Sequence, residues 1–143
     1  METSSVLKER RPLPIVDLTD LIGKPYQDGG RGPHAYDCYG LAIEVCRRYG
    51  IMLPQYIISA DDVALINGIA TLHQGWIKCD PNGTIPCVMA LRFDSRYINH
   101  VGVYLGKGRF IHIAKDIRVH ISRIDHPLWK DNIAGYYLPE KGG

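Results

Sequence analysis

The strongest constraint on the fold is the division of the second half of the chain into short β-type segments. Beyond Gly75, runs rich in β-branched and aromatic residues are bounded by glycine, proline, asparagine or aspartate. The pattern predicts strands over Trp76–Cys79, Pro86–Phe93, Ile98–Leu105, Arg109–Ala114, Arg118–Ile121 and Ile133–Leu138. The second half is therefore expected to form a β-sheet.

The first half carries helical signals. From Cys38 to Tyr49 apolar residues recur at the 3.6-residue spacing of an amphipathic helix, and Gly50 supplies its end. A short helix is also expected over Val16–Ile22, and another over Ser59–Leu72, which opens with a capping-box pattern. Helices followed by strands indicate the α+β class, with N-terminal helices packed on a largely antiparallel sheet.

Size and charge narrow the possible functions. The 143 residues suit a single core: an extended lead-in over 1–14, one domain over 15–140 and a frayed tail over 141–143. A formal net charge of +2 makes nucleic acid a poor candidate partner. No apolar run approaches the ~20 residues of a membrane span, and Met1–Arg11 has no hydrophobic signal core. We therefore expect a protein that is cytoplasmic when synthesised.

The four cysteines, Cys38, Cys46, Cys79 and Cys87, are expected to be thiols. Their spacing matches no common zinc site, so we expect neither a metal nor a cofactor. Cys38 lies at the beginning of a predicted helix, where the helix dipole and unpaired N–H groups favour a thiolate. Cys46 lies on the apolar face of the same helix, where a buried thiol is unreactive. Cys79 and Cys87 are assigned structural roles, which leaves Cys38 as the candidate nucleophile.

A catalytic cysteine needs a base, and the base needs a group that fixes its ring. His100 and His112 lie on the two arms of a predicted hairpin that turns at Gly106–Gly108. If this turn is a three-residue loop, Leu105 pairs with Arg109. The two histidines are then the candidate base and its orienting partner.

The loop length decides whether these histidines can cooperate. In the three-residue register Gly102 faces His112, so that His100 and His112 share one face as diagonal neighbours roughly 7 Å apart at Cβ. A two-residue loop would place them on opposite faces. The glycine at position 102 leaves room between the rings for a substrate or for the helix that carries the nucleophile.

Taken one at a time, these features are common in proteins without catalysis. A cysteine at a helix start is usually a small buried residue, and a strand histidine is usually a hydrogen-bonded or half-exposed side chain. Their combination indicates a catalytic site. Surface or packing roles are expected for His34, His73, His120, His126, Trp76 and Trp129.

Several short motifs follow one another in a recognisable order. They are Gly23-x-Pro-Tyr26, Gly29-Gly30, Asp37-Cys38-Tyr39-Gly40-Leu41, Gly50-Ile51-x-Leu53-Pro54 and His100-Val101-Gly102-Val103-Tyr104-Leu105-Gly106-x-Gly108-x-Phe110-Ile111-His112. In this order, over residues 19 to 138, the chain resembles the NlpC/P60 family of cysteine peptidases. The resemblance implies a papain-like α+β core. It also implies hydrolysis of amide bonds in bacterial cell-wall peptides, of the D-γ-glutamyl-diamino acid type.

The resemblance assigns roles to the catalytic residues. Cys38 becomes the nucleophile, His100 the general base and acid, and His112 the polar third member that orients His100. The backbone N–H of Cys38 becomes a donor to the developing oxyanion. No cofactor or metal is implied.

The same resemblance assigns residues to the substrate side. Tyr26 would donate a hydrogen bond to the oxyanion or the substrate, and Asp37 would receive a substrate amine. Tyr39 stands where the family usually has serine, so it would enlarge or block part of the pocket wall. The usual Pro-Gly-Asp segment before the histidine strand is absent, and Asn82–Cys87 stands there instead.

The Asp37–Gly40 motif, the missing signal core and the closing Trp129 with Ile133–Tyr136 resemble the phage-tail and prophage branch of the family. The expected partners are therefore peptidoglycan peptides and phage tail proteins, in a protein associated with the virion. Two alternatives stay open: a non-catalytic tail-assembly module, and an acyltransferase or different amidase on the same fold. Thiol reactivity distinguishes the first alternative from an enzyme, and product analysis distinguishes the second.

Overall fold

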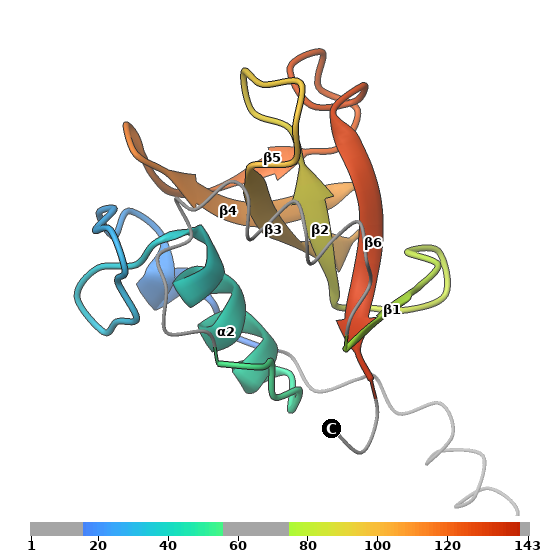
Figure 1. The fold of residues 1–143 in the computed structure, drawn as a ribbon. Helices are drawn as coiled ribbons and strands as arrows, with labels where there is room; N and C mark the ends of the chain where they lie inside the picture. Colours follow the sequence, from blue (N-terminus) through green and yellow to red (C-terminus); the bar gives the residue numbers. More distant parts are fainter. Residues whose placement is uncertain (1–15, 56–74, 141–143) are drawn as a thin grey trace, which may run out of the picture.

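The computed structural model describes residues 16–55 and 75–140, in which an α-helix packs on a six-stranded sheet (Figure 1). All neighbouring strands are antiparallel, in the order β1-β6-β2-β3-β4-β5. The elements are η1 (Thr19–Leu21), α2 (Cys38–Arg48), β1 (Trp76–Lys78), β2 (Cys87–Leu91), β3 (His100–Gly106), β4 (Arg109–Ala114), β5 (Ile117–Arg123) and β6 (Ile133–Pro139). The α+β prediction is confirmed, and each predicted strand is present with small shifts at its ends.

Of the three helices predicted from the sequence, one is confirmed, one is wrong in extent and one lies outside the described residues. The helix predicted from Cys38 is confirmed as α2. The helix predicted over Val16–Ile22 is wrong in extent, because only Thr19–Leu21 form a 3₁₀ turn. Beyond that turn the backbone bonds to β5, where the N–H of Val119 donates to the carbonyl oxygen of Lys24 at 3.0 Å. The predicted helix over 59–72, the lead-in over 1–14 and the tail over 141–143 lie outside the described residues.

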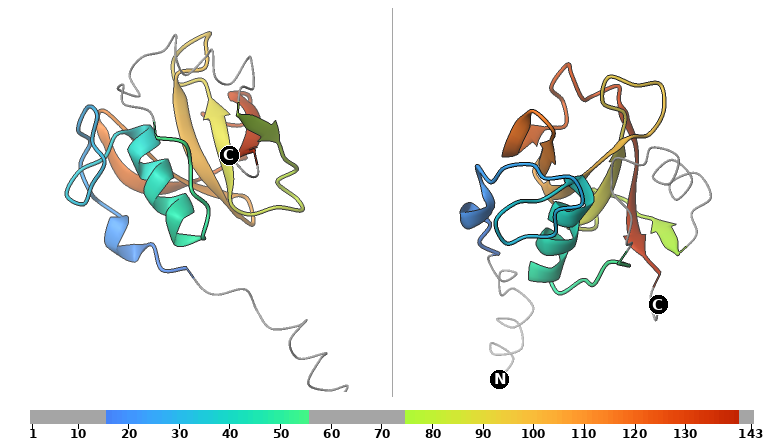
Figure 2. Two further views of the ribbon diagram at one scale, coloured as in Figure 1. Left: turned by 60° about the horizontal axis from the view of Figure 1, so that its bottom comes forward. Right: turned by 60° about the vertical axis from the view of Figure 1, so that its left-hand side comes forward.

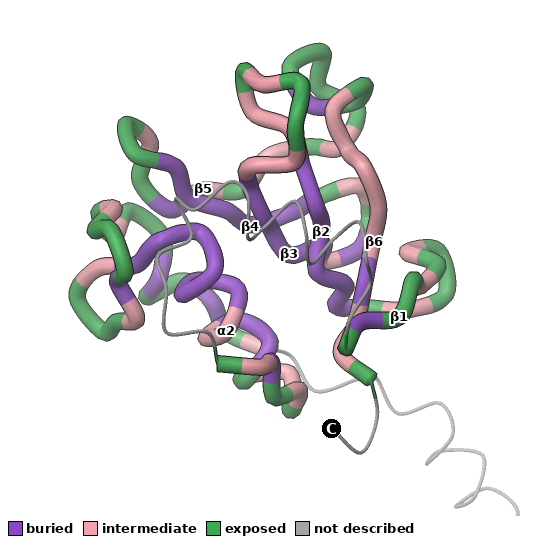
Figure 3. The backbone as a smooth tube through the Cα atoms, viewed as in Figure 1, coloured by how far each residue is buried: buried purple, intermediate pink, exposed green. Residues whose placement is uncertain are grey.

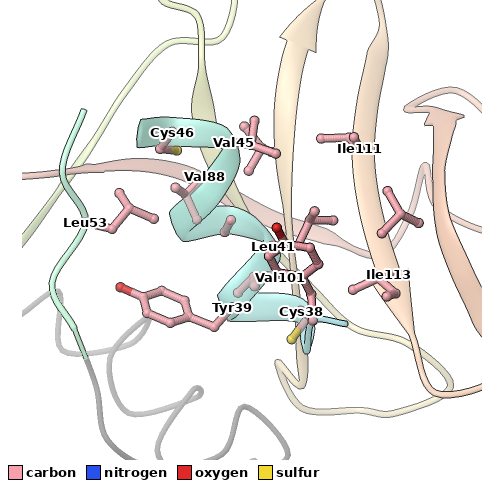
Figure 4. Close-up of a cluster of buried hydrophobic side chains, with 14 of the residues drawn as sticks. Cys38, Tyr39, Leu41, Val45, Cys46, Leu53, Val88, Val101, Ile111 and Ile113 are labelled. Atoms are coloured by element: carbon pink, nitrogen blue, oxygen red, sulfur yellow. The ribbon is translucent and has the colours of Figure 1, made fainter. Parts of the chain in front are cut away.

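The sheet is covered on both faces. On one face α2 lies across β3 and β4, as the two views of Figure 2 show. Leu41 and Val45 of the helix join Val101 and Ile111 of the strands in one buried cluster (Figure 4). A second buried cluster occupies the opposite face; it consists of Cys87, Met89, Leu91, Tyr104, Phe110 and Trp129. Every residue of β2 is buried for this reason, and Figure 3 shows the buried backbone concentrated in α2 and the central strands.

The β3–β4 hairpin places His100 and His112 on one face of the sheet, as predicted, but its turn differs from the predicted one. Gly106 pairs with Arg109 across a two-residue turn, and a bulge separates the Tyr104 and Gly106 pairs, so the predicted pairing of Leu105 with Arg109 is wrong. Both turn residues, Lys107 and Gly108, have positive φ angles of 55° and 76°, as a type I′ turn requires. The bulge adds one residue to β3, which restores the register that a three-residue loop would have given.

Gly102 therefore faces His112, but not the helix. A Cβ atom added to Gly102 would lie 3.0 Å from Phe110 Cδ2 and 3.3 Å from His112 Cβ. The neighbours of Gly102, Val101 and Val103, point to the other face and contact the α2 cluster, because successive strand residues alternate. The expectation that Gly102 makes room for the nucleophile's helix is wrong, since aromatic side chains fill that space.

All four cysteines are free thiols. Cys46 is fully buried, and burial raises its pKa to about 12, which agrees with the predicted unreactive thiol. Cys79 and Cys87 bracket the loop between β1 and β2, with their Sγ atoms 2.6 Å apart. Burial raises the pKa of both thiols, so neither has the environment of a nucleophile. Among residues 16–55 and 75–140, no helix combines the length and hydropathy needed to cross a membrane.

A matched pair of isoleucines tests the packing between the helix and the sheet. Ile111 and Ile121 are directly paired on β4 and β5, but Ile111 is fully buried and Ile121 is 42% exposed. We expect Ile111→Ala to lower the free energy of unfolding by about 2–5 kcal/mol, because it removes buried methyl groups and leaves a cavity. Ile121→Ala should lower it by less than about 1 kcal/mol. Urea denaturation measures both changes, and equal losses would contradict the assigned core.

Candidate active site

Cys38 is positioned by the cap of α2. The backbone of Asp37 is extended, and its Oδ1 accepts hydrogen bonds from the N–H of Gly40 at 2.6 Å and from Arg31 Nη1 at 2.7 Å. A Cβ atom on Gly40 would collide with the carbonyl oxygen of Gly30, so the first helical turn lies directly against the preceding loop. Acid, cysteine and glycine at these spacings thus place Cys38 at the first position of the helix.

Cys38 and His100 line one cavity of about 300 Å³. Cys38 is the first residue of α2 and His100 is the first residue of β3, so the cavity lies where these two elements begin. The cavity wall consists of Tyr26, Cys38, Phe93, Asn99, His100, Ile113, Ala114 and Lys115. The helix start and the strand start therefore bring the candidate nucleophile and base to the same space.

His100 and His112 form a hydrogen-bonded pair, as the sequence predicts. His100 Nε2 lies 2.9 Å from His112 Nδ1, and the ring centroids are 5.2 Å apart with an interplanar angle of 65°. The second nitrogen of His112, Nε2, lies 2.8 Å from Ser122 Oγ on β5. His112 thus uses both ring nitrogens inside the protein, and the Nδ1 atom of His100 is the one not engaged by His112.

Aromatic side chains enclose this pair. Trp129 stacks on His100 with centroids 5.8 Å apart and an angle of 24°, and its ring meets the edge of His112 at 4.9 Å and 88°. Phe110 also packs on His112 at 4.4 Å, and its ring meets that of Trp129 edge to face at 5.8 Å. Burial among these rings lowers the pKa of His100 to about 4, and the pKa of His112 is lowered by burial and by the charge of His100. Both rings are therefore neutral near pH 7 in the structure.

The three residues predicted on the substrate side have different surroundings. Tyr26 lines the cavity beside Cys38. Asp37 is fully buried, and the carboxylate that was expected to receive a substrate amine bonds the chain itself. Tyr39 is also buried; it donates a hydrogen bond to the carbonyl oxygen of Pro54 at 2.5 Å and points away from Cys38 toward Leu53 (Figure 4). The structure therefore favours helix-positioning roles for Asp37 and Tyr39.

Several contacts at the site have no clear signal in the sequence. His120, for which the sequence indicates a surface or hydrogen-bonded role and no partner in register, pairs with His112 across β4 and β5, with ring centroids 4.3 Å apart. Asn99 bonds both the N–H and the carbonyl oxygen of Phe93, at 2.7 and 2.9 Å, and so closes the loop beside the cavity. The predicted packing role of Trp129 is confirmed. His120 and Ser122 could have been found from the period-two alternation of β5 once its register with β4 was known.

Known proteins resemble this chain in sequence and in fold. The NlpC/P60 family matches residues 87–137. The chain is 30% identical over 132 residues to a "Gamma-DL-glutamyl hydrolase" of Bacillus subtilis, covering 86% of this chain and 28% of that protein. It is 28% identical over 115 residues to a "Probable endopeptidase p60" of Listeria grayi, covering 80% of this chain and 20% of that protein. The chain therefore spans less than a third of the length of either relative.

A solved structure supports the fold. An NLP/P60 family protein from Staphylococcus aureus, described as similar to lipoprotein, superposes with a TM-score of 0.59 at 22% identity. The superposition covers 83% of this chain and 37% of that chain. This likeness confirms the predicted arrangement of helix and antiparallel sheet.

The cap of α2 predicts a graded loss of stability at Asp37. Asp37→Ala removes the acceptor of the Gly40 N–H and the partner of Arg31, so we expect the free energy of unfolding to fall by about 2–4 kcal/mol. Asp37→Asn keeps an oxygen for the cap and should cost less. Asp125→Ala, which removes an exposed partner of Arg123, serves as the control and should leave the urea midpoint unchanged. Equal midpoints for Asp37→Ala and the wild type would contradict this role.

The buried histidines predict a loss of stability in mild acid. The unfolded chain binds protons at the ordinary histidine pKa of 6.5, whereas folded His100 binds them only near a pKa of about 4. The stabilisation is present above pH 6.5 and is lost as the pH falls from there toward 4. We expect the free energy of unfolding to fall by about 2 kcal/mol for His100 between pH 7 and pH 5. Urea titrations should show a weaker pH dependence in His100→Asn, while the exposed His34→Asn variant should follow the wild type.

Proposed function

Because the chain belongs to the NlpC/P60 family, we propose that it is a cysteine peptidase that hydrolyses amide bonds in peptidoglycan peptides. The observation that carries this proposal is the shared cavity of Cys38 and His100, with His100 held by His112 at 2.9 Å. The relatives named as a gamma-DL-glutamyl hydrolase and a probable endopeptidase support the same class of reaction.

The proposed reaction begins at the sulfur of Cys38. The thiolate attacks the carbonyl carbon of the substrate amide, and the protonated Nδ1 of His100 gives its proton to the leaving amine. A thioester on Cys38 remains. His100 then takes a proton from water, whose oxygen attacks the thioester, so that the peptide leaves as a carboxylate and the thiol is restored. His112 holds the His100 ring through Nε2 in both steps.

The proposal assigns two donors to the oxyanion of the tetrahedral intermediate. The backbone N–H of Cys38 belongs to the first turn of α2, whose N–H groups have no acceptor within the helix. Tyr26 lines the same cavity as Cys38, and its hydroxyl group is the second donor. Such donors stabilise the transition state by a few kcal/mol in acyl-transfer enzymes.

The cavity suits an acidic peptide. The wall includes the basic side chain of Lys115, and none of the described wall residues is acidic. A γ-linked glutamate keeps its α-carboxylate free at the other end of its side chain, and an ammonium group on the cavity wall would attract it. We therefore propose D-γ-glutamyl-diamino acid peptides as the substrate, and the name of the Bacillus subtilis relative supports a γ-glutamyl bond.

A phage or prophage origin belongs to the same proposal. The support is the Asp37-Cys38-Tyr39-Gly40 sequence, with tyrosine after the cysteine, and the segment from Trp129 to Tyr136. Under this proposal the protein is made in the cytoplasm and joins the virion, with tail proteins as partners. Co-purification with tail particles of the phage that encodes it tests the assignment.

Hydrolysis of purified muropeptides, followed by mass spectrometry of the products, tests the proposed reaction. We expect Cys38→Ala and His100→Ala to abolish hydrolysis. Cys46→Ala is the matched control, because it removes a thiol two turns further along the same helix and should keep activity. An unchanged rate in Cys38→Ala would exclude the mechanism. Substrate consumption with transfer to an added amine would instead indicate an acyltransferase.

His112→Asn should reduce turnover less than His100→Ala, by about tenfold or somewhat more, because an amide or water can still hold the His100 ring in part. The rate of muropeptide hydrolysis at saturating substrate measures this loss. Equal losses in the two variants would mean that His112 itself takes part in proton transfer.

A further inference from the structure

The hydrogen-bonded chain that begins at His100 continues beyond His112 to Ser122. We propose that Ser122 is a positioning residue that accepts a hydrogen bond from His112 and thereby sets which nitrogens of both rings carry protons. The catalytic consequence rests on the proposed peptidase function, whereas the proton arrangement can be measured without it.

The contacts form a continuous chain across three strands. His100 on β3 contacts His112 on β4 at 2.9 Å, and His112 contacts Ser122 on β5 at 2.8 Å. Ser122 pairs in register with Phe110, whose ring packs on His112, so the hydroxyl is held beside the ring by the strand pairing itself. A side chain on the outer strand of the sheet therefore reaches the base through one intervening ring.

Two proton arrangements satisfy these contacts. In the first, His112 Nε2 donates to Ser122 Oγ, His112 Nδ1 accepts from His100 Nε2, and His100 Nδ1 carries a lone pair. In the second, Ser122 donates to His112 Nε2, His112 Nδ1 donates to His100 Nε2, and the proton of neutral His100 lies on Nδ1. In the first arrangement His100 Nδ1 can take the proton of Cys38, and in the second it cannot.

Catalysis needs the first arrangement in both charge states of His100. When His100 is neutral, its Nδ1 must accept the thiol proton. When His100 is protonated, both of its nitrogens donate, so His112 Nδ1 must accept and His112 Nε2 must donate. Ser122 is the acceptor of that last bond in either state.

The surroundings of Ser122 allow its hydroxyl oxygen to accept a hydrogen bond from His112 Nε2. Ser122 and His120 line a second cavity, of about 590 Å³, which shares no lining residue with the cavity of Cys38, so water there can accept the hydroxyl hydrogen. His120 does not replace Ser122, because its Nδ1 lies 2.8 Å from the carbonyl oxygen of Arg118 and donates to it. Without Ser122, a proton on His112 Nε2 loses its acceptor among the described residues, and the second arrangement becomes competitive.

Nitrogen-15 NMR of protein labelled at histidine measures the arrangement directly. In the wild type near pH 7 we expect the proton of His112 on Nε2 and that of His100 on Nε2. In Ser122→Ala we expect both signals to move toward the Nδ1-protonated form, and Ser122→Thr, which keeps the hydroxyl, should restore them. Ser95→Ala is the control, because Ser95 Oγ contacts the N–H of Tyr97 and neither histidine.

The rates of Cys38 alkylation and of muropeptide hydrolysis should both fall in Ser122→Ala and recover in Ser122→Thr. Alkylation of Cys38 by iodoacetamide should slow about tenfold in Ser122→Ala below the pH midpoint of the reaction, and that midpoint should move to higher pH. For muropeptide hydrolysis, kcat should fall about tenfold with KM unchanged. Ser122→Thr should recover both rates.

The outcomes separate this inference from the proposed function. A wild-type protein without hydrolase activity, but with the expected nitrogen-15 signals and their loss in Ser122→Ala, would refute the peptidase assignment and support the role of Ser122. A wild-type His112 protonated on Nδ1 would overturn the inference. Signals and alkylation profiles that are identical in Ser122→Ala and the wild type would also overturn it, whatever the activity.

Discussion

The pairing of β3 with β4 is the constraint on which the site depends. The bulge at Leu105 inserts one residue between the Tyr104 and Gly106 pairs and so keeps His100 and His112 on one face of the sheet. A two-residue turn without the bulge would direct one of the two rings into the α2 cluster, since side chains alternate along a strand. The 2.9 Å contact between the rings is a consequence of this register.

Burial then determines the chemical state of the pair. Trp129 packs on both rings and Phe110 on His112, and the cost of placing a charge in these buried surroundings lowers the pKa of each imidazole. A base enclosed in this way needs hydrogen-bond partners for its nitrogens, because an unpaired polar atom in the interior costs free energy. His112 and Ser122 supply a continuous set of partners from the face of the sheet to its outer strand.

The nucleophile is held by a separate and more local device. Asp37, buried and paired with Arg31, caps α2, and Gly40 lets the loop at Gly30 lie against the first turn. Cys38 is thereby fixed at the helix start, where it lines a cavity with His100. The site is thus the meeting point of a capped helix and a bulged hairpin, two rigid elements from different layers of the fold.

Local sequence patterns predict much of the fold. Turn residues indicate where the strands end, and apolar periodicity gives the extent of α2 and distinguishes Cys38 from Cys46. The order of the motifs was enough to indicate the family. Only the tertiary structure decided the bulge at Leu105, the contact of His112 with Ser122 and His120, the cover that Trp129 provides and the burial of Asp37. These depend on which strands pair and in what register, and such pairing is set by packing between residues far apart in the chain, which a local pattern does not encode.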